Sequence, residues 1–466
     1  MNPDKHIALA LADTMLAREA SLESLIAAVE RALDARWPWV AGMCEALLAR
    51  TGENFHYFSR REIAGLILLL LGRSKTDEGD DRSDPDAVEL PFVDLPPIKR
   101  YCTDLPLQPE PDAWLAALAL PSIPTLGQLA QLLNVEADDL DWFADQSRAG
   151  SSKPARLQHY HYRWMAKRSG GMRLIEIPKQ RLRHMQHTIL RKLLDRVPAH
   201  DAAHGFRLGR SCVTHAALHA GRRVVIRMDL KDFFPSIPAS RIHALFIKLG
   251  YSDSVAATLA RLCTNRTPPA AFSDKQTGGT LPWAQRHALH SPHLPQGSPC
   301  SPALANLCAW RLDLRLAALS ASIGAVYSRY ADDLVFSGGR TLERAAERFH
   351  VEVAAIAIEE GFHLNTRKTR VMRSGVRQQV TGVVINQHPN VCRDDFDVLK
   401  ATLTNCVRHG PDSQNREGRP HYRHYLCGKV AWVRMLNPAR GAKLDKLLTA
   451  ISWPSAPSAI LADFPD

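Results

Sequence analysis

The chain has 466 residues, of which 59 are Lys or Arg and 48 are Asp or Glu, for a formal charge of +11. A hydrophobic content of 45% with 23% charged residues excludes wholesale disorder, and the length suggests about three packed units. The charge is uneven: residues 1–150 hold 13 basic and 25 acidic side chains, whereas residues 151–466 hold 46 and 23. The basic part indicates a polyanionic partner, with a merely basic surface as the alternative.

Nine cysteines are scattered without a CxxC pair, which favours reduced thiols over a disulfide framework or a zinc site. The N-terminus shows no signal-peptide pattern. The most apolar run, Ile63 to Leu71, is nine residues long, whereas a membrane span needs about 20. We therefore expect a cytoplasmic protein without membrane contact, in which this run forms a buried helix.

Residues 1–72 predict a helical N-terminal extension, because apolar side chains recur at helical spacing over residues 22–33 and 63–71. Residues 73–112 are first acidic and then rich in proline, with few large apolar side chains. Such a composition predicts a linker rather than a packed element.

Two helices are predicted at the front of residues 113–222, where Thr125 and Gln128 fit a capping box and Asn134 suits the helix end. The second helix covers residues 137–146. The pattern then predicts strands at 173–177, 224–229, near 370 and at 380–385, and a hairpin at 326–336. Helices are predicted at 182–194, 238–249, 255–263, 301–319 and 342–360. A loop is predicted at 264–296, and further helices follow to the C-terminus. Such mixed strands and helices indicate an α+β fold.

Two segments place carboxylates at the ends of apolar strands. Asp332 and Asp333 interrupt the apolar hairpin 326–336, and Asp229 ends the strand 224–229. For Asp332 and Asp333 alone, an acidic hairpin turn is the structural alternative. Charge beside a core is costly unless cations neutralise it, and hard Mg²⁺ prefers oxygen ligands. Two such strand ends could hold a pair of metal ions about 3.5–4 Å apart.

A third segment, Leu294–Pro302, is a proline-rich turn that opens a helix, and Gly297 in it admits close approach to a planar ligand. In this order the three segments resemble the palm of reverse transcriptases. Asp229 with Phe233 and Phe234 is similar to the first metal motif, the sequence LPQGSP to the template-nucleotide motif, and YADD to the YxDD box. Further segments extend the resemblance over roughly residues 115–450: 170–178 with Gln186 (a fingers motif), 204–211 (a GF…GRS element) and 365–369 (the palm lysine motif).

Two features resemble the retron type within this group. Residues 380–382, with the sequence VTG, match an element near the thumb. Residues 215–219 match a second element, except that His215 replaces its usual asparagine, which leaves the role of that amide open in this chain. Residues 1–110 resemble the N-terminal extension of some longer members.

The resemblance implies a two-metal site. Asp229, Asp332 and Asp333 would bind two Mg²⁺ ions, with Mn²⁺ as an alternative ion, and would promote attack of a primer hydroxyl on a dNTP. Asp232 is the less favoured ligand because of its place in the motif. A structural acidic cluster is the alternative.

The resemblance also implies dNTP-binding residues. Phe234 would act as a steric gate against a ribose 2′-hydroxyl, and Gln296 and Gly297 would pack beneath the templating pair. Arg173 would meet the triphosphate, and Lys368 would neutralise or protonate the leaving pyrophosphate. The structural alternatives are a core aromatic, a turn that only begins the next helix, and basic surface side chains.

RNA contacts are implied at two places. Val380, Thr381 and Gly382 would touch the cognate RNA, with a β-bulge glycine as the alternative. His219 would contact RNA or support the strand of Asp229, and a satisfied structural histidine is its alternative. The C-terminal run would lay basic and aromatic side chains on a duplex: Arg408, Arg416, Arg419, Tyr422, Arg423, Tyr425, Lys429, Trp432, Arg434, Arg440, Lys443 and Lys446.

The resemblance therefore implies an α+β right-hand polymerase with a helical N-terminal extension. Residues 113–222 would carry the N-terminal helices and fingers, residues 223–388 the palm, and residues 389–466 the thumb. Its function would be RNA-directed DNA synthesis in a retron, which copies a cognate noncoding RNA into a branched RNA–DNA (msDNA) primed by a guanosine 2′-hydroxyl. An accessory effector protein and antiphage defence would accompany it. The alternatives are a group II intron, diversity-generating or stand-alone defence reverse transcriptase, and a non-catalytic RNA-binding scaffold.

Overall fold

The computed structural model of the chain describes residues 3–58, 60–72, 95–102, 113–144, 155–167, 171–272 and 281–453. The chain forms two compact units, each built from two stretches of sequence. The first unit combines residues 1–197 with 237–301, and the second combines residues 198–236 with 302–466. The domain boundaries expected after residues 112, 222 and 388 remain predictions, and most of the expected linker 73–112 lies outside the described residues.

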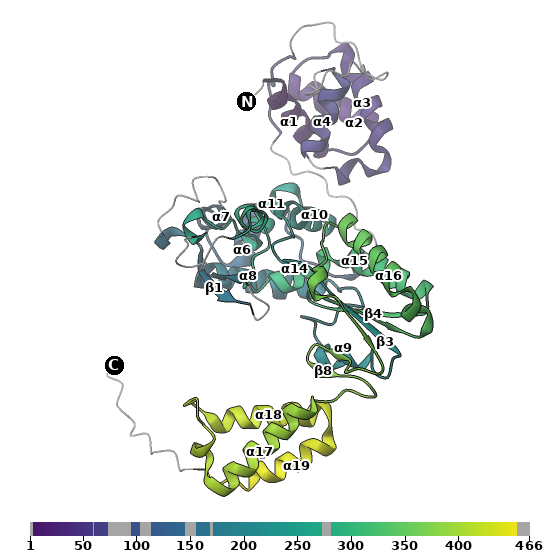
Figure 1. Ribbon diagram of the computed structural model, residues 1–466. Coiled ribbons are helices and arrows are strands. Elements are labelled where there is room, and N and C mark those ends of the chain that lie inside the picture. Colours follow the sequence, from purple (N-terminus) through teal and green to yellow (C-terminus); the bar gives the residue numbers. More distant parts are fainter. Residues whose placement is uncertain are drawn as a thin grey trace, which may run out of the picture. The chain divides into compact units, whose positions relative to one another are not determined.

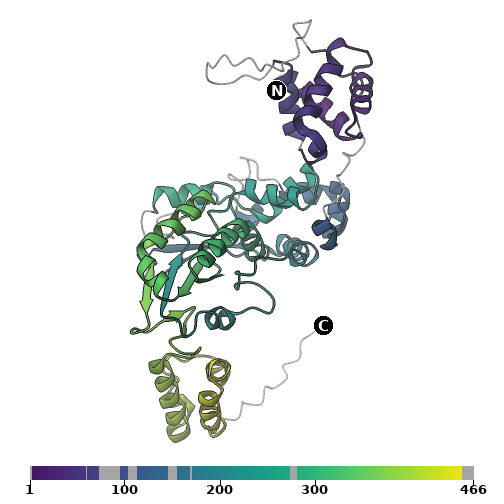
Figure 2. The same ribbon diagram turned by 90° about the vertical axis from the view of Figure 1, so that its right-hand side faces the viewer.

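Helices dominate the first unit (Figures 1 and 2). Its elements are α1 Pro3–Leu16, α2 Leu22–Leu33, α3 Pro38–Thr51, η1 Gly52–Tyr57, α4 Arg60–Leu70, α5 Ala113–Ala117, α6 Leu126–Leu133, α7 Ala137–Ala144, η3 Ala155–Leu157, β1 Tyr160–Ala166, β2 Met172–Pro178, α8 Gln180–Lys192, η4 Leu194–Arg196, α10 Ala239–Lys248, α11 Asp253–Cys263, η5 Pro269–Phe272 and α13 Trp283–His290.

The second unit contains a four-stranded sheet with its covering helices and three C-terminal helices. Its elements are α9 Cys212–Ala217, β3 Val224–Asp229, α14 Ser301–Cys308, α15 Trp310–Ser322, β4 Val326–Tyr330, β5 Asp333–Gly338, α16 Arg340–Glu359, η6 Thr366–Lys368, β6 Arg370–Arg373, β7 Gln379–Val380, β8 Val383–Val384, α17 Arg393–His409, η7 Pro411–Ser413, α18 Tyr422–Leu436 and α19 Pro438–Thr449.

The predicted N-terminal helices form a bundle with a core of its own. Buried side chains of α1 to α4, among them Leu11, Leu25, Met43 and Ile63, make one apolar cluster that Leu95 completes. The apolar run expected to be a buried helix is α4, which confirms that prediction. In the described ranges no helix is both long and apolar enough to cross a membrane.

Helix α6 is capped by Thr125 and Asn134 as the sequence predicts, with one of the two hydrogen bonds of the predicted capping box. The Thr125 hydroxyl accepts a hydrogen bond from the Gln128 amide at 3.2 Å, and Asn134 ends α6 in the left-handed conformation that a short polar side chain tolerates. The hairpin β1–β2 follows, with Met165 paired to Arg173. These elements carry the candidate fingers of the first unit.

The sheet of the second unit is antiparallel throughout, in the order β4-β5-β3-β6. Period-2 alternation sends Ile226 and Phe336 to one face, where the Phe336 ring packs edge-on against Phe349 of α16 at 5.0 Å. The opposite face carries Val225 and Val335, which belong to a second apolar cluster. That cluster extends to the C-terminal helices α17, α18 and α19 and so ties the candidate thumb to the sheet.

Two expectations about helices are wrong. The stretch 264–296, expected as a loop, contains η5 and α13, because α13 buries only Leu289 and therefore shows little apolar periodicity. The single helix expected at 301–319 is two helices, α14 and α15, because Ala309 between them leaves helical geometry at ψ 3°. One non-helical residue does not disturb the spacing of apolar side chains, so the sequence pattern did not reveal it.

Candidate active site

The three predicted carboxylates lie together at one edge of the sheet. Asp229 at the end of β3 pairs in register with Asp333 at the start of β5. Asp333 also pairs with Tyr330 across the tight β4–β5 turn, in which Ala331 has a φ of +56°. The backbone oxygen of Asp332 accepts a hydrogen bond from the Leu230 amide at 2.8 Å. Strand pairing thus brings acids 104 residues apart into one cluster.

Burial and mutual repulsion raise the pKa values of two of these acids, Asp332 and Asp333. Burial raises the pKa of Asp332, and the carboxylates of Asp333 and Asp229 raise it further. Burial also raises the pKa of Asp333, against the opposing effect of the Arg227 guanidinium. Mutual repulsion among half-buried carboxylates means that a divalent cation would be bound favourably here.

Two cations engage the carboxylates in this structure. The Lys368 ammonium donates to both carboxylate oxygens of Asp229, at 2.9 and 2.8 Å. The Arg227 guanidinium donates from Nη2 to both oxygens of Asp333 at 2.8 Å, and from Nε at 3.0 Å. Within the described ranges no three His, Cys, Asp or Glu side chains form a preassembled metal-binding group. The donor set still fits Mg²⁺, because it consists of hard carboxylate oxygens on a rigid sheet edge.

Arg227 was not among the residues predicted from the sequence. It lies two residues before Asp229 on β3, so both side chains point to the same face of the sheet. A single Arg within the apolar strand Val224–Asp229 was the available signal.

Lys368 and Asn365 hold Asp229 from the adjoining segment. The Asn365 amide donates to the backbone oxygen of Asp229 at 2.7 Å, and η6 then carries the Lys368 side chain to the carboxylate. The predicted palm lysine therefore lies at the site. In this structure it neutralises Asp229, and its contact with pyrophosphate remains a prediction.

Phe234 lies beside the cluster, after a turn in which Asp232 has a φ of +47°. Its ring centroid is 5.6 Å from that of Phe233, which is buried, and 6.2 Å from that of Phe206, which is half exposed. Phe234 itself is only partly buried, so the core-aromatic alternative does not describe it.

The other predicted dNTP-binding residues belong to the first unit. Arg173 is exposed on β2, and its contact with a triphosphate remains a prediction. Gln296 accepts a hydrogen bond from the Glu176 amide at 2.9 Å. At Gly297, with a φ of +137°, a Cβ atom would lie 2.6 Å from the Glu176 carbonyl oxygen. The close approach that this glycine permits in the structure is therefore to β2.

The burial of His219 argues against the predicted RNA contact. Its side chain is 0% exposed, and its two ring nitrogens hydrogen bond with Ser337 on β5 at 2.8 Å and Ser328 on β4 at 2.7 Å. Burial, followed by nearby histidines and Arg222, lowers the pKa of His219 to about 3, so the ring is neutral. It ties the strands of the carboxylate hairpin together, as a satisfied structural histidine.

His215 is a second buried ring beneath the hairpin. Its centroid lies 5.7 Å from those of Tyr330 and His219. Burial, followed by the charge of His204, lowers its pKa to about 3. The residue that departs from the family pattern therefore packs under the active-site turn as a neutral ring.

The VTG element is a two-residue hairpin turn, so the β-bulge alternative is wrong. Val380 pairs with Val383, and the residues between them have φ values of +47° at Thr381 and +84° at Gly382, as a type I′ turn requires. Val380 is fully buried, whereas Gly382 is exposed at the tip. The predicted RNA contacts are thus sterically open at Gly382 but not at the Val380 side chain, and Thr381 is partly buried, with its hydroxyl donating to the Cys212 oxygen at 3.2 Å.

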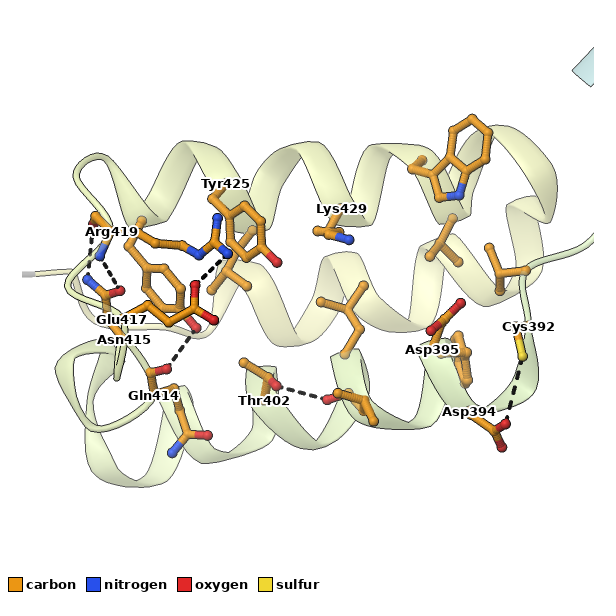
Figure 3. A pocket seen from close by; sticks show the side chains of 18 of the residues that line it. Cys392, Asp394, Asp395, Thr402, Gln414, Asn415, Glu417, Arg419, Tyr425 and Lys429 are labelled. Carbon is orange, nitrogen blue, oxygen red and sulfur yellow. Dashed lines mark hydrogen bonds and ion pairs between the residues drawn. The ribbon is translucent and has the colours of Figure 1, made fainter. Parts of the chain in front are cut away.

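A groove of about 500 Å³ lies among α17, α18 and the segment that joins them, and Gly382 lines it together with these helices. Figure 3 shows Tyr425 and Lys429 on α18 across the groove from Thr402 on α17. The Arg419 guanidinium lies 4.6 Å, and the Lys429 ammonium 5.7 Å, from the Tyr425 ring centroid. The groove thus combines the VTG turn with the basic and aromatic residues expected to contact a duplex.

Comparison with known proteins agrees with these features. Residues 165–398 match the family model described as reverse transcriptase (RNA-dependent DNA polymerase). The chain is 42% identical over 295 residues to the retron Mx65 reverse transcriptase of Myxococcus xanthus, covering 62% of this chain and 64% of that relative. It is 36% identical over 338 residues to the retron Mx162 reverse transcriptase of the same organism, covering 69% and 66%.

A third relative, the retron Ec86 reverse transcriptase of Escherichia coli, is 30% identical over 289 residues, which cover 60% of this chain and 76% of the relative. The chain therefore spans just under two thirds of the length of the two Myxococcus xanthus proteins. The matched region includes the whole carboxylate sheet, from β3 to β6.

Proposed function

Because this chain belongs to the retron reverse transcriptases, we propose that it is an RNA-directed DNA polymerase that works by two-metal nucleotidyl transfer. The observation that supports this most directly is the convergence of Asp229, Asp332 and Asp333 at the paired ends of β3 and β5. Without a cation, these buried and partly buried acids would repel one another, and this cost is consistent with a metal-binding role.

Asp229, Asp332 and Asp333 would hold two Mg²⁺ ions in this proposal. When bound, the ions would supply Lewis acidity to the primer hydroxyl and the α-phosphate. Lys368, which pairs with Asp229 in this structure, would neutralise or protonate the leaving pyrophosphate. Arg227 keeps its position on Asp333 and limits the charge repulsion within the site.

Substrate selection depends on further residues in this proposal. The Phe234 ring clashes with a ribose 2′-hydroxyl and so selects dNTPs. Gln296 and Gly297 lie under the templating base, and Arg173 binds the triphosphate through its planar guanidinium.

The partner of the basic residues 151–466 is a cognate noncoding RNA together with its cDNA. The turn at Thr381 and Gly382 and the α17–α18 groove contact this RNA through shape, stacking and phosphate charge. Synthesis starts from a guanosine 2′-hydroxyl of the same RNA and leaves a branched msDNA. The protein acts in the cytoplasm in antiphage defence.

Residues 1–110, which include the N-terminal bundle, dock a protein partner or a basic surface of this chain. Residues 1–150 have a charge balance of −12, opposite to the rest of the chain. Deletion of residues 1–110 tests this role, because the bundle has its own core and its removal leaves the sheet intact. Unchanged RNA binding, polymerisation and defence in the deletion variant would count against it.

Primer extension tests the enzymatic proposal. Wild-type protein with Mg²⁺, dNTPs and the cognate RNA should incorporate nucleotides, and Asp332→Asn should abolish incorporation without loss of fold by circular dichroism. The matched control is Glu347→Gln, which changes an exposed acid on α16 outside the carboxylate cluster and should leave activity unchanged. Absence of incorporation by the wild-type protein on its RNA would favour a non-catalytic RNA-binding scaffold.

A further inference from the structure

The segment 202–206 lies directly against the carboxylate hairpin. The Arg329 amide donates to the Ala202 oxygen at 2.7 Å, and the His204 amide donates to the Arg329 oxygen at 2.8 Å. These bonds add a short parallel bridge to the edge of β4. The segment is therefore fixed to the strand that leads into the active-site turn.

Gly205 brings this segment into van der Waals contact with the turn itself. A Cβ atom at this position would lie 2.7 Å from the backbone nitrogen of Ala331. The Asn306 side-chain amide donates to the Gly205 oxygen at 2.9 Å. Because no side chain fits between them, the next residue, Phe206, is placed by the active-site turn.

The backbone conformation of Phe206 costs free energy that the burial of its side chain does not fully offset. Its φ is +61°, a left-handed value that is an outlier for a bulky aromatic residue and costs about 1–3 kcal/mol. The side chain remains 49% exposed, so apolar burial only partly offsets that cost. Strain of this kind clusters at functional sites.

The strained backbone directs the Phe206 ring toward two residues of the site. Its centroid lies 6.2 Å from that of Phe234 and 6.4 Å from that of Tyr330. Phe234 therefore has one buried ring neighbour, Phe233, and one exposed ring neighbour, Phe206. Phe233 is buried in the core, so Phe206 is the ring neighbour of Phe234 that lies at the surface.

We propose that Phe206 is a positioning residue for sugar selection, which limits the movement of the Phe234 ring and so sharpens its clash with a ribose 2′-hydroxyl. A gate ring that can rotate away tolerates the extra hydroxyl, whereas a braced ring rejects it. This inference rests on the proposed function, because it requires Phe234 to be the gate.

The test is single-nucleotide incorporation by the full chain on an RNA template, with dCTP and CTP compared as the incoming nucleotide. Phe234→Ala should lower the discrimination between them by about a hundredfold, and Phe206→Ala by about tenfold. Phe206→Tyr keeps the ring and should restore wild-type discrimination. The double variant should lose little more than Phe234→Ala alone, because both residues act through one ring. Leu208→Ala, at a fully exposed neighbour, is the matched control.

Phe206→Gly separates positioning from a structural role. Glycine adopts the left-handed φ without strain, so the thermal midpoint of this variant should equal or exceed that of the wild type. Its nucleotide discrimination should nevertheless fall as in Phe206→Ala. Unchanged discrimination with an altered midpoint would overturn the proposal.

The roles of Phe234 and Phe206 are distinguished by these variants. If Phe234→Ala lowers discrimination while Phe206→Ala and Phe206→Gly leave it intact, the bracing role of Phe206 is wrong and the gate stands. If Phe234→Ala itself leaves discrimination unchanged, the gate assignment is wrong, and the role of Phe206 is wrong with it.

Discussion

At the scale of single residues, two acids of the carboxylate cluster, Asp229 and Asp333, are each paired with a basic side chain. Asp229 is 8% exposed in its side chain and is paired with Lys368, which is 37% exposed. Asp333 is paired in the same way with Arg227. The protein thus folds with the charges of these two acids partly neutralised.

Lys368→Met should slow nucleotide incorporation by about 10²-fold, because it removes both the cation that orients Asp229 and a proton donor to pyrophosphate. Lys368→Arg should recover only part of the rate, since a guanidinium pairs with Asp229 but does not release a proton at neutral pH. The rate of a single incorporation at saturating dNTP measures this. Full recovery in Lys368→Arg would show that proton donation is not part of its role.

Individual residues show how far a sequence can be interpreted. The three acids and Lys368 belong to motifs that occur in a characteristic order along the sequence. Their chemical roles could therefore be predicted without knowledge of their positions in space. The partners of these acids were harder to predict, because register decides that Arg227 reaches Asp333 and burial decides that His219 is inaccessible. Both depend on strand pairing between segments more than 100 residues apart, which local patterns do not encode.

At the scale of elements, a buried ion pair fixes the active-site turn. Arg329 on β4 and Asp313 on α15 are both 0% exposed and form two hydrogen bonds, at 2.8 and 2.6 Å. The same guanidinium donates to the Ala331 oxygen at 3.1 Å and to Asn306 at 3.0 Å. Helix α15 thereby holds the left-handed residue that precedes the two acids.

Arg329→Met should destabilise the protein by about 3–5 kcal/mol, because it leaves the Asp313 carboxylate buried without a cation and with the Tyr327 hydroxyl as its remaining hydrogen-bond donor. Adding Asp313→Leu should recover much of that loss, since a buried apolar pair is often as stable as a buried ion pair. Urea unfolding of the single and double variants measures both effects. A double variant as unstable as Arg329→Met would contradict this account.

A second buried pair joins the candidate fingers to the LPQGSP turn within the first unit. The Glu176 carboxylate of β2 hydrogen bonds with His293 at 2.9 Å and accepts from Asn265 and Thr267. Burial alone would raise the pKa of Glu176 and lower that of His293. The interaction between them prevails, so the pKa of Glu176 is lowered and that of His293 is raised.

The Glu176–His293 pair should stabilise the fold only within a limited range of pH. The contribution of His293 is fully present below its ordinary pKa of 6.5 and is lost as the pH rises through the raised folded value. The contribution of Glu176 is present above its ordinary pKa of 4.5 and is lost as the pH falls through its lowered value. The stability difference between wild type and His293→Gln should therefore be larger at about pH 5.5 than at about pH 9. Urea unfolding measures it, and a difference that grows toward high pH would contradict the pairing.

At the scale of the whole molecule, the charge of +11 conceals two opposite parts. The acidic part includes a bundle with its own apolar core, and the basic part includes the polymerase sheet and the α17–α18 groove. The positive surplus thus belongs to the part that would bind nucleic acid. Composition alone gave this division, whereas the bundle core became visible only in the structure.

Measurements of RNA binding should distinguish phosphate contacts from base stacking in the α17–α18 groove. Lys429→Ala should weaken binding and reduce the slope of log affinity against log salt by about 0.7–0.9, because one phosphate contact is lost. Tyr425→Ala should weaken binding by about 1–3 kcal/mol with an unchanged slope, because stacking releases no counterions. Filter binding of the cognate RNA across salt concentrations measures both, and identical slopes for wild type and Lys429→Ala would argue against phosphate contact.

The central claim is that this chain copies one cognate RNA into DNA with the carboxylates of β3 and β5. Sequencing of the DNA that copurifies with the protein from cells carrying its native locus tests it most directly. The account predicts one fixed cDNA joined covalently to RNA through a guanosine 2′-hydroxyl, and no such DNA with Asp332→Asn. Heterogeneous or protein-linked DNA, or the same product from Asp332→Asn, would contradict it.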